Sequence, residues 1–179
     1  MAILKIRKYG EDILEKKCER INFNLMESKL PKIIDDMTQT CLAMQGVGLA
    51  APQVGLNMSL AVIMLPVDEN GPSKPESERL YKRYVLINPE ISSSKGVVDS
   101  EEGCLSFPGL EIKIERAKEV KVKCLNENGL PVEIQTSGPF AIVLQHEIDH
   151  LYGRTFIDRL YGEAKKDALD KIKELRRRW

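Results

Sequence analysis

The stretch Gln145-His146-Glu147-Ile148-Asp149-His150 decides which architecture the rest of the chain must provide. It holds both histidines of the protein. On a helix, side chains four residues apart lie on the same face and can bind one metal ion. Glu147, next to His146, is the type of residue that moves protons at such a site. The stretch is therefore typical of a metal-dependent hydrolase whose central helix carries two of the metal ligands.

The residues around this stretch predict a helix over residues 140–152. Gly138-Pro139 suits its first turn, and Gly153 can end it. A second helix is expected over residues 27–45, with Pro31 in its first turn. A third is expected near the end of the chain, and its apolar side would consist of Ala164, Leu169, Ile172 and Leu175.

Two short apolar runs, residues 60–65 and 84–88, predict buried strands, each ended by a proline. From Leu110 onward apolar and charged residues alternate, and Asn128-Gly129 is a strong turn signal, so this region predicts an antiparallel meander. The polar segment 68–79 is expected to be an exposed loop. Strands grouped between helices, without regular strand–helix alternation, predict an α+β fold with antiparallel strands around the central helix.

Length and composition limit the classes of protein to consider. A single catalytic domain is expected over residues 1–179, with residues 160–179 as its C-terminal helix. The formal net charge is zero, which argues against DNA binding, and no apolar run approaches the ~20 residues of a membrane span. The first residues lack a secretion signal, so the cytoplasm is the expected compartment and the four cysteines are expected to be free thiols.

A catalytic metal ion needs a third protein ligand, which cannot be histidine because the chain has only two. Phe156 stands where a metzincin peptidase would have its third histidine. Carboxylates at Asp158, Glu163 or Asp170 would make a site like that of zincin metallopeptidases, whereas Cys104 would supply a thiolate from a glycine-flanked segment. A structural metal site in a protein without enzymatic activity is a further alternative.

A segment of small residues, 46–55, follows the helix predicted over residues 27–45. Its glycines and alanines would let another backbone approach closely, and Gln53 can both donate and accept hydrogen bonds. The simplest interpretation is a helix end followed by a tight turn into a strand. A phosphate-binding loop is not indicated, because no Lys-Ser or Lys-Thr pair follows the glycines.

Three segments taken together show a resemblance to a known family. Gly46-Val47-Gly48-Leu49-Ala50-Ala51-Pro52-Gln53, Glu102-Gly103-Cys104-Leu105-Ser106 and Gln145-His146-Glu147-Ile148-Asp149-His150-Leu151 match, in order, the three signature motifs of peptide deformylases. The resemblance extends over residues 5–158. It implies a metal-dependent hydrolase that removes the formyl group from the formyl-methionine of nascent polypeptides and releases formate.

The resemblance also implies roles for single residues. Glu147 would be the general acid/base, while the side chain of Gln53 and the backbone N–H of Leu105 would stabilise the developing oxyanion. The substrate peptide would lie along the segment 46–48. Ile142 and Val143, one turn before His146 on the same helix, are expected to line the methionine pocket. The implied metal ligands are Cys104, His146 and His150, and the implied edge for the substrate is Gly46, Val47 and Gly48.

Cofactor and partners follow from the same resemblance. One divalent metal ion is implied, with Fe²⁺ expected and Zn²⁺, Ni²⁺ or Co²⁺ as alternatives in the purified protein. The substrates would be N-formylmethionyl nascent peptides, and no DNA or membrane partner is expected. The basic segment 171–179 has two interpretations. It is either the end of a helix, where cations are favoured by the helix dipole, or a surface that contacts the ribosome.

Overall fold

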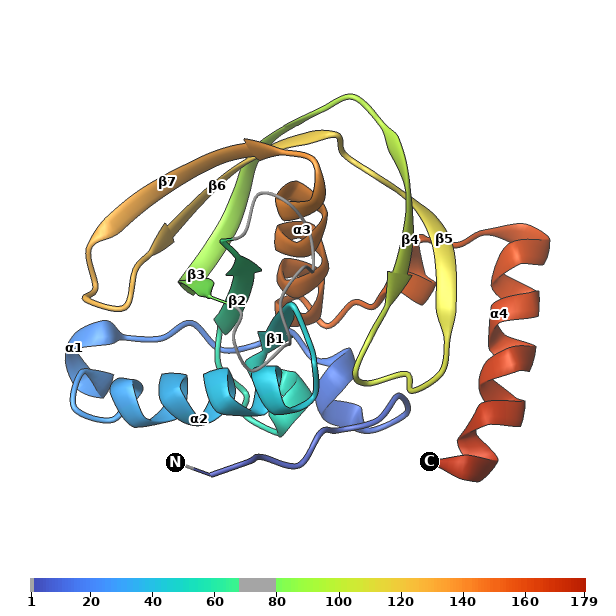
Figure 1. Cartoon of the computed structure of the whole chain (residues 1–179), viewed down its shortest axis with the longest axis horizontal. Helices are drawn as coiled ribbons and strands as arrows, with labels where there is room; N and C mark the ends of the chain where they lie inside the picture. The colour runs from blue at the N-terminus through green and yellow to red at the C-terminus, as the bar shows by residue number, and fades with distance from the viewer. Residues whose placement is uncertain (1, 68–79) are drawn as a thin grey trace.

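The computed structural model describes residues 2–67 and 80–179 and confirms the α+β architecture (Figure 1). In the described part, the main sheet has the strand order β1-β2-β3-β6-β7 with all pairs antiparallel, and β4 and β5 form a second sheet. The strands are β1 (Gly48–Ala50), β2 (Leu60–Pro66), β3 (Tyr81–Lys95), β4 (Val98–Gly103), β5 (Glu111–Arg116), β6 (Glu119–Leu125) and β7 (Pro131–Ser137). The α-helices are α1 (Phe23–Met26), α2 (Leu30–Ala43), α3 (Pro139–Leu151) and α4 (Gly162–Leu175). Short 3₁₀ helices are η1 (Asp12–Glu15), η2 (Ala51–Val54), η4 (Phe156–Arg159) and η5 (Arg176–Arg178).

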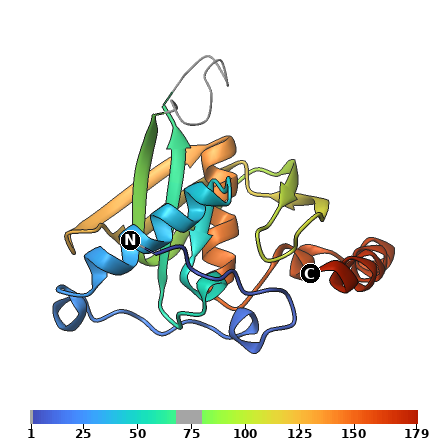
Figure 2. The same ribbon diagram turned by 60° about the horizontal axis from the view of Figure 1, so that its bottom comes forward.

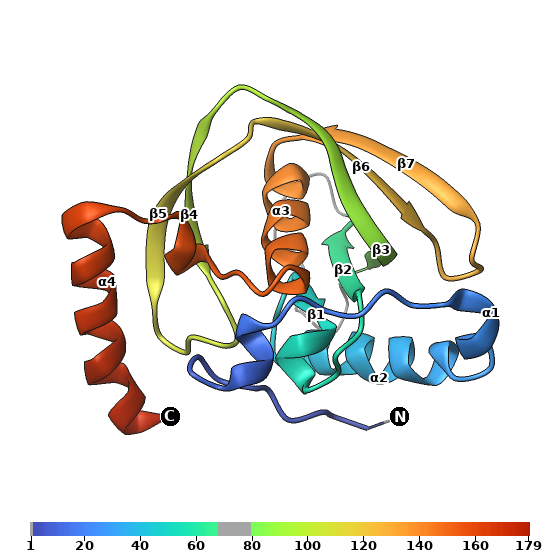
Figure 3. The same cartoon turned by 180° about the vertical axis from the view of Figure 1, so that it is seen from behind.

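Strand β2 shows why the main sheet is buried on both faces. Leu60, Val62 and Met64 pack into the apolar cluster that includes α2, whereas Ala61 and Ile63 pack into the cluster that includes α3. Successive side chains of a strand point to opposite faces, so a strand between two layers is apolar throughout. Figures 1 and 3 show α2 and α3 lying against this sheet from different sides. The strand predicted from this continuous apolar run is confirmed.

The second sheet continues the β3–β6 pair beyond a bend. Gly96, with a φ of +64°, lies between β3 and β4, and residues 117–118 lie between β5 and β6. The meander expected from Leu110 is wrong in its first half, because β5 pairs with β4, and only β6 and β7 form the predicted hairpin. Residues 117–118 are Ala-Lys, which lacks the preference for positive φ that Asn128-Gly129 brings to a tight hairpin turn.

A glutamine of α3 holds this bend in place. The side chain of Gln145 accepts a hydrogen bond from the backbone N–H of Ala117 and donates one to its carbonyl oxygen, both at 2.9 Å. The second sheet is therefore fixed to the central helix at the point where the strands bend. As a result, Cys104, in the loop after β4, lies close to the two histidines of α3.

Strand β3 continues through Pro89, where the sequence predicted its end. Proline has no N–H to donate to a neighbouring strand, and the register with β6 shifts between Ile87 and Glu90. Asn88 has a φ of +53° at this bulge, and its side chain donates to and accepts from the backbone of Ile21 (2.9 and 2.8 Å). A bulge thus accommodates the proline. The expected strand is confirmed, but its expected end is wrong.

Helix α3 is the central helix, and its ends are those that the sequence predicted. Pro139 occupies its first turn, after Gly138 with a φ of +67°. Gly153 follows the helix with a φ of +69°, and a side chain there would begin 2.7 Å from the carbonyl oxygen of Glu15. Glycine is needed there for the turn and for the close approach of the N-terminal segment.

Helix α4 lies on the outer side of the second sheet, as Figures 1 and 2 show from two directions. The predicted helix is confirmed, but its buried stripe begins one turn later than expected. Ala168 and Ile172 are buried, whereas Ala164 is exposed. None of the helices in the described part is long and apolar enough to cross a membrane. The loop predicted over residues 68–79 lies outside the described residues.

Candidate metal centre

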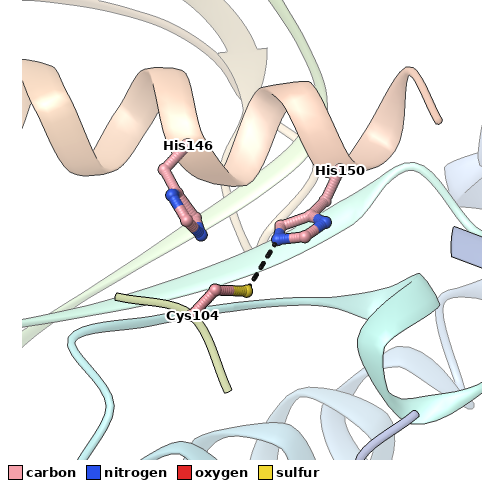
Figure 4. A group of neighbouring side chains, drawn as sticks. All are labelled: Cys104, His146 and His150. Carbon is pink, nitrogen blue, oxygen red and sulfur yellow. Dashed lines mark hydrogen bonds between the residues drawn. The ribbon is translucent and has the colours of Figure 1, made fainter. Parts of the chain in front are cut away.

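Three candidate ligands meet between α3 and the loop that follows β4. His146 and His150 lie one turn apart on α3, and Cys104 follows Gly103, the last residue of β4. Their donor atoms lie within 4.8 Å of one another, and Cys104 Sγ is 3.3 Å from His150 Nε2. Figure 4 shows the three side chains pointing toward one another. The structure therefore brings together the three residues that the sequence predicted as ligands.

The chemistry of these donors fits a divalent metal ion. A thiolate and two imidazoles are suitable ligands for zinc and iron. His146 Nδ1 is 2.8 Å from Glu102 Oε2, which leaves the Nε2 atom of His146 for a metal. Burial lowers the pKa of His150, and the positive charges of His146 and Arg116 lower it further. This imidazole is therefore neutral, which is the form that binds metals.

The carboxylates considered as alternative ligands lie elsewhere in the fold. Asp158 accepts hydrogen bonds from the backbone N–H and the hydroxyl of Thr155 (2.8 and 3.1 Å) at the start of η4. Glu163 and Asp170 are exposed on α4. Among the described residues, the cluster of donor atoms around the histidine pair includes Cys104 and none of these carboxylates.

The other three cysteines differ from Cys104 in their surroundings. All four are free thiols, as predicted, but Cys104 is partly accessible whereas Cys18, Cys41 and Cys124 are buried. Burial raises the pKa of Cys41 to about 12 and the pKa values of Cys18 and Cys124 to about 11. These three therefore act as small apolar groups of the core.

Behind His146 lies a chain of ion pairs centred on the buried Arg116. Arg116 on β5 donates to both carboxylate oxygens of Glu102 (2.7 and 2.8 Å) and to Asp149 Oδ2 (2.5 Å). Arg159 donates twice to Asp149, both at 2.7 Å. Burial alone would raise the pKa of Glu102, but the hydrogen bonds from Arg116 and His146 outweigh it and lower this pKa to about 2. The carboxylate that orients His146 is therefore charged.

Glu147 lies beside the ligands, with its carboxylate against β1. Burial raises its pKa to about 7, despite the opposing positive charge of His146. Its Oε2 atom is buried and has no hydrogen-bond partner among the described residues. A side chain at Gly48 would begin 2.2 Å from Glu147 Oε1, so glycine leaves the space that the carboxylate fills. A buried carboxyl with a pKa near neutrality is suited to accept and return a proton.

Gln53, on η2, reaches the thiol from a separate segment. The side-chain oxygen Oε1 of Gln53 accepts a hydrogen bond from the backbone N–H of Ala50 (2.8 Å), which orients the side-chain amide. Its Nε2 atom then faces Cys104 Sγ and Ser106 Oγ, at 3.4 Å from each. The contact with Ser106 Oγ is long for an N–H···O hydrogen bond, and the sulfur of Cys104 is a weak acceptor. The amide is therefore able to exchange them for a better acceptor on a bound molecule.

An open cavity of about 860 Å³, a size that suits a short peptide, is lined in part by Cys104, His146 and Glu147. Ser100, on β4, also lines it. His150 is 1 % exposed and is not among the lining residues. The predicted site residues on the wall are Gly46, Val47, Gly48, Gln53, Cys104, Leu105, Ile142, Val143, His146 and Glu147.

Sequence comparison agrees with this geometry. The profile of the polypeptide deformylase family matches residues 3–166. The chain belongs to this family. A peptide deformylase of Elusimicrobium minutum (strain Pei191) is 49% identical over 179 residues, which cover 100% of this chain and 99% of the relative. A peptide deformylase of Aquifex aeolicus (strain VF5) is 43% identical over 167 residues, or 93% of each chain.

Solved structures of deformylases share the fold. A peptide deformylase from Legionella pneumophila is 39% identical with a TM-score of 0.82, covering 98% of this chain and 96% of the other. One from Synechococcus elongatus, in complex with actinonin, is 35% identical with a TM-score of 0.80, covering 97% and 87%. Deformylases are metal-dependent hydrolases that remove N-formyl groups from nascent polypeptides. The predicted family, fold class and activity of this chain are thereby confirmed.

The residues that support the candidate ligands were missed in the sequence. Glu102 and Asp149 belong to the quoted motifs, but only their burial beside Arg116 shows what they contact. Arg116 did carry a signal. It continues the alternation of Ile112 and Ile114 and so falls on the inward side of β5, where a charged residue requires a buried partner.

Proposed function

We propose that Cys104, His146 and His150 hold a divalent metal ion at which formyl-methionyl peptides are hydrolysed, with Glu147 as the general acid/base. One observation carries the proposal: the buried, unpartnered Oε2 atom of Glu147 belongs to the residue next to a metal-binding triad. The metal ion, when bound, would supply Lewis acidity and lower the pKa of water.

The protein groups around the triad would then act on the formamide. Glu147 accepts a proton from the attacking water and returns it to the amine that leaves when the formyl C–N bond breaks, giving formate and a free N-terminus. Gln53 Nε2 and the backbone N–H of Leu105 donate hydrogen bonds to the oxygen that gains negative charge. Both residues line the cavity: Leu105 follows Cys104 in the chain, and the side chain of Gln53 faces Cys104.

The substrate would bind along β1, which is one of the two edge strands of the main sheet in the described part. An extended peptide can add to such an edge through backbone hydrogen bonds. Gly48 is the first residue of β1, Gly46 and Val47 directly precede it, and all three line the cavity. Ile142 and Val143, on α3, offer an apolar wall for the methionine side chain.

Replacing Glu147 with Gln tests the proposal. Formate release from formyl-Met-Ala-Ser should fall by about 10²–10⁴-fold, because the proton carrier is lost while the ligands remain. Metal content, measured by elemental analysis, should not change. Glu163→Gln, on the exposed face of α4, is the matched control and should keep full activity. Near-normal turnover by Glu147→Gln would reassign the base, and cleavage of internal peptide bonds without deformylation would favour the metallopeptidase alternative.

The native metal is proposed to be Fe²⁺. The mixed thiolate and imidazole donors accept iron(II) and zinc(II) alike, and divalent zinc, cobalt and nickel bind such donors more tightly than iron. A protein purified in air is therefore expected to contain these metals in place of iron. Elemental analysis after anaerobic purification should give one iron per chain, and a fully active zinc-loaded protein from the same preparation would reject the assignment.

The substrate also implies where the protein works. We propose that it acts in the cytoplasm on nascent chains and that the surface of α4 and η5 contacts the ribosome. Residues 162–179 contain seven lysine or arginine residues and four acidic ones, in a chain whose formal net charge is zero. Such a local excess of cations can bind RNA without a global field.

A further inference from the structure

Trp179 folds back onto the loop that carries the thiol ligand. This ligand loop, residues 104–110, joins β4 to β5. The indole N–H of Trp179 donates to the carbonyl oxygen of Pro108 (3.2 Å). Its ring meets that of Phe107 edge-on, with centroids 6.4 Å apart and planes at 85°. Figures 1 and 3 show the end of the chain, marked C, near this loop.

Phe107 extends this contact toward the metal ligands. Its side chain is fully buried, and its backbone N–H donates to the carbonyl oxygen of Cys104 (2.9 Å). The ring packs against Phe156, with centroids 4.7 Å apart, and Phe156 in turn lies 6.0 Å from the ring of His146. Cys104 packs against the same cluster. Trp179 is therefore linked to two of the three ligands through packed aromatic rings.

Different segments hold the two halves of the ligand loop. Trp179 holds the second half at Pro108, next to Gly109, whose φ is +76°. Both Pro108 and Gly109 line the cavity, so a shift there changes the wall that a substrate meets. The first half is held by the N-terminal segment, through Lys8 Nζ to the carbonyl of Leu105 (3.0 Å) and Tyr9 N–H to the carbonyl of Ser106 (3.0 Å).

We propose that Trp179 is a positioning residue for the ligand loop. It fixes the second half of the loop and thereby the position of Cys104 and of the adjacent cavity wall. This inference rests on the proposed roles of Cys104 and His146 as metal ligands. It gives η5 and the end of α4 a part in building the site, although no residue of α4 or η5 lines the cavity.

The test compares Trp179→Ala, Trp179→Phe and a control in the metal-loaded protein. The control is Tyr161→Ala, because Tyr161 precedes α4 and is 81% exposed. Loss of zinc to an excess of chelator should be about tenfold faster or more in Trp179→Ala, as expected when a ligand loses its support. Trp179→Phe keeps the ring but not the N–H, so its rate should lie between wild type and Trp179→Ala. Tyr161→Ala should match wild type.

Kinetics provide a second measurement. KM for formyl-Met-Ala-Ser should rise about fivefold to tenfold in Trp179→Ala, since a hydrogen bond and an aromatic contact hold the cavity wall, while far-UV circular dichroism stays that of wild type. Equal zinc loss and equal KM in wild type and both Trp179 variants would overturn the inference. Where Trp179→Ala does not fold, Trp179→Phe decides by the same comparison.

The single tryptophan also reports the loop directly. Emission from Trp179 in the wild-type protein should change when zinc is removed and return when zinc is restored. An unchanged spectrum would contradict the link between Trp179 and the ligands. Neither zinc loss nor emission depends on turnover. Failure of the proposed reaction would therefore appear as absent formate release, with these two signals intact.

Discussion

Gly48 shows how the absence of a side chain can fix the position of Glu147, the proposed proton carrier. A Cβ atom at this residue would lie 2.2 Å from Glu147 Oε1 and 2.7 Å from Glu147 Cδ, closer than atoms can approach. Gly48→Ala must therefore displace the carboxylate or the strand. Displacing a catalytic group by about 1 Å can cost about 10²-fold in rate, and overpacking costs about 1–3 kcal/mol of stability. We expect both losses, measured as kcat/KM for formyl-Met-Ala-Ser and by urea unfolding.

The steric origin of these losses can be separated from other effects of the substitution. Gly103→Ala is the matched control, because its Cβ atom would meet nothing closer than 3.8 Å. In a Glu147→Ala background, Gly48→Ala should lose little further stability, since the clashing carboxylate is gone. A full stability loss in that background would show that Gly48 matters for the strand and not for Glu147.

The residue scale also shows where sequence reasoning reaches its limit. Spacing alone assigned His146 and His150 to one site, because a helix fixes which side chains share a face. The choice between Cys104 and a downstream carboxylate depended on tertiary structure. It therefore stayed open until motif resemblance, and then the fold, placed the thiol beside His150.

At the scale of elements, Arg116 joins the second sheet to the central helix. Its side chain is fully buried between two carboxylates, Glu102 of β4 and Asp149 of α3. Arg116→Met would leave Glu102 buried with only His146 as a partner. Removing one member of a buried ion pair costs about 3–5 kcal/mol, and losing the support of a metal-binding histidine costs about 10–100-fold in metal affinity. Urea unfolding and zinc titration should show both effects.

Arg159→Met removes the partly exposed cation beside Asp149, for comparison with the loss of the buried Arg116. The Arg159 side chain is 34% exposed, and Asp149 would keep its bond to Arg116. We therefore expect a loss of about 1 kcal/mol, typical of a partly exposed ion pair, and unchanged zinc affinity. If Arg116→Met and Arg159→Met lower stability and zinc affinity equally, the ion pairs act through their total charge and not through the orientation of His146.

Helices and strands could be predicted where neighbouring residues in the sequence carry the signal. The ends of α3 follow from Pro139 and Gly153, and β2 follows from its unbroken apolar run. Strand β4 was not recognised, because its inward residues are Ser100 and Glu102, both polar. These residues are buried beside the site, so the usual alternation of apolar and polar residues is absent where function requires polar groups.

At the scale of the whole molecule, distant segments supply the site, and the pairing of β4 with β5 is what aligns them. This pairing could not be predicted from local patterns, because residues 117–118 carry no turn signal and the bend is held by Gln145 from another element. The resemblance to deformylases indicated that the three motifs belong to one site. The physical reason they meet is this bend over α3, visible in Figure 1.

The outer surface of the molecule offers a last test, of the proposed ribosome contact. Arg177 and Arg178 are exposed on η5, outside the cavity. Reversing both charges, Arg177→Glu with Arg178→Glu, should weaken co-sedimentation with ribosomes and reduce the slope of log affinity against log salt by about 1–2, because each cation that contacts a phosphate contributes about one. Hydrolysis of formyl-Met-Ala-Ser should be unchanged, since these side chains are not part of the site.

A charge-matched control shows whether the position of these cations matters. Lys29→Glu with Lys95→Glu makes the same change in net charge at two exposed residues of other elements, one directly before α2 and one at the end of β3. If the basic surface of η5 is the contact, this control should sediment with ribosomes as wild type does. Equal losses in both double variants would mean that ribosomes respond to net charge alone. No loss in either would place any ribosome contact on another face of the molecule, and the cations of η5 would then be explained by the favourable field at a helix C-terminus.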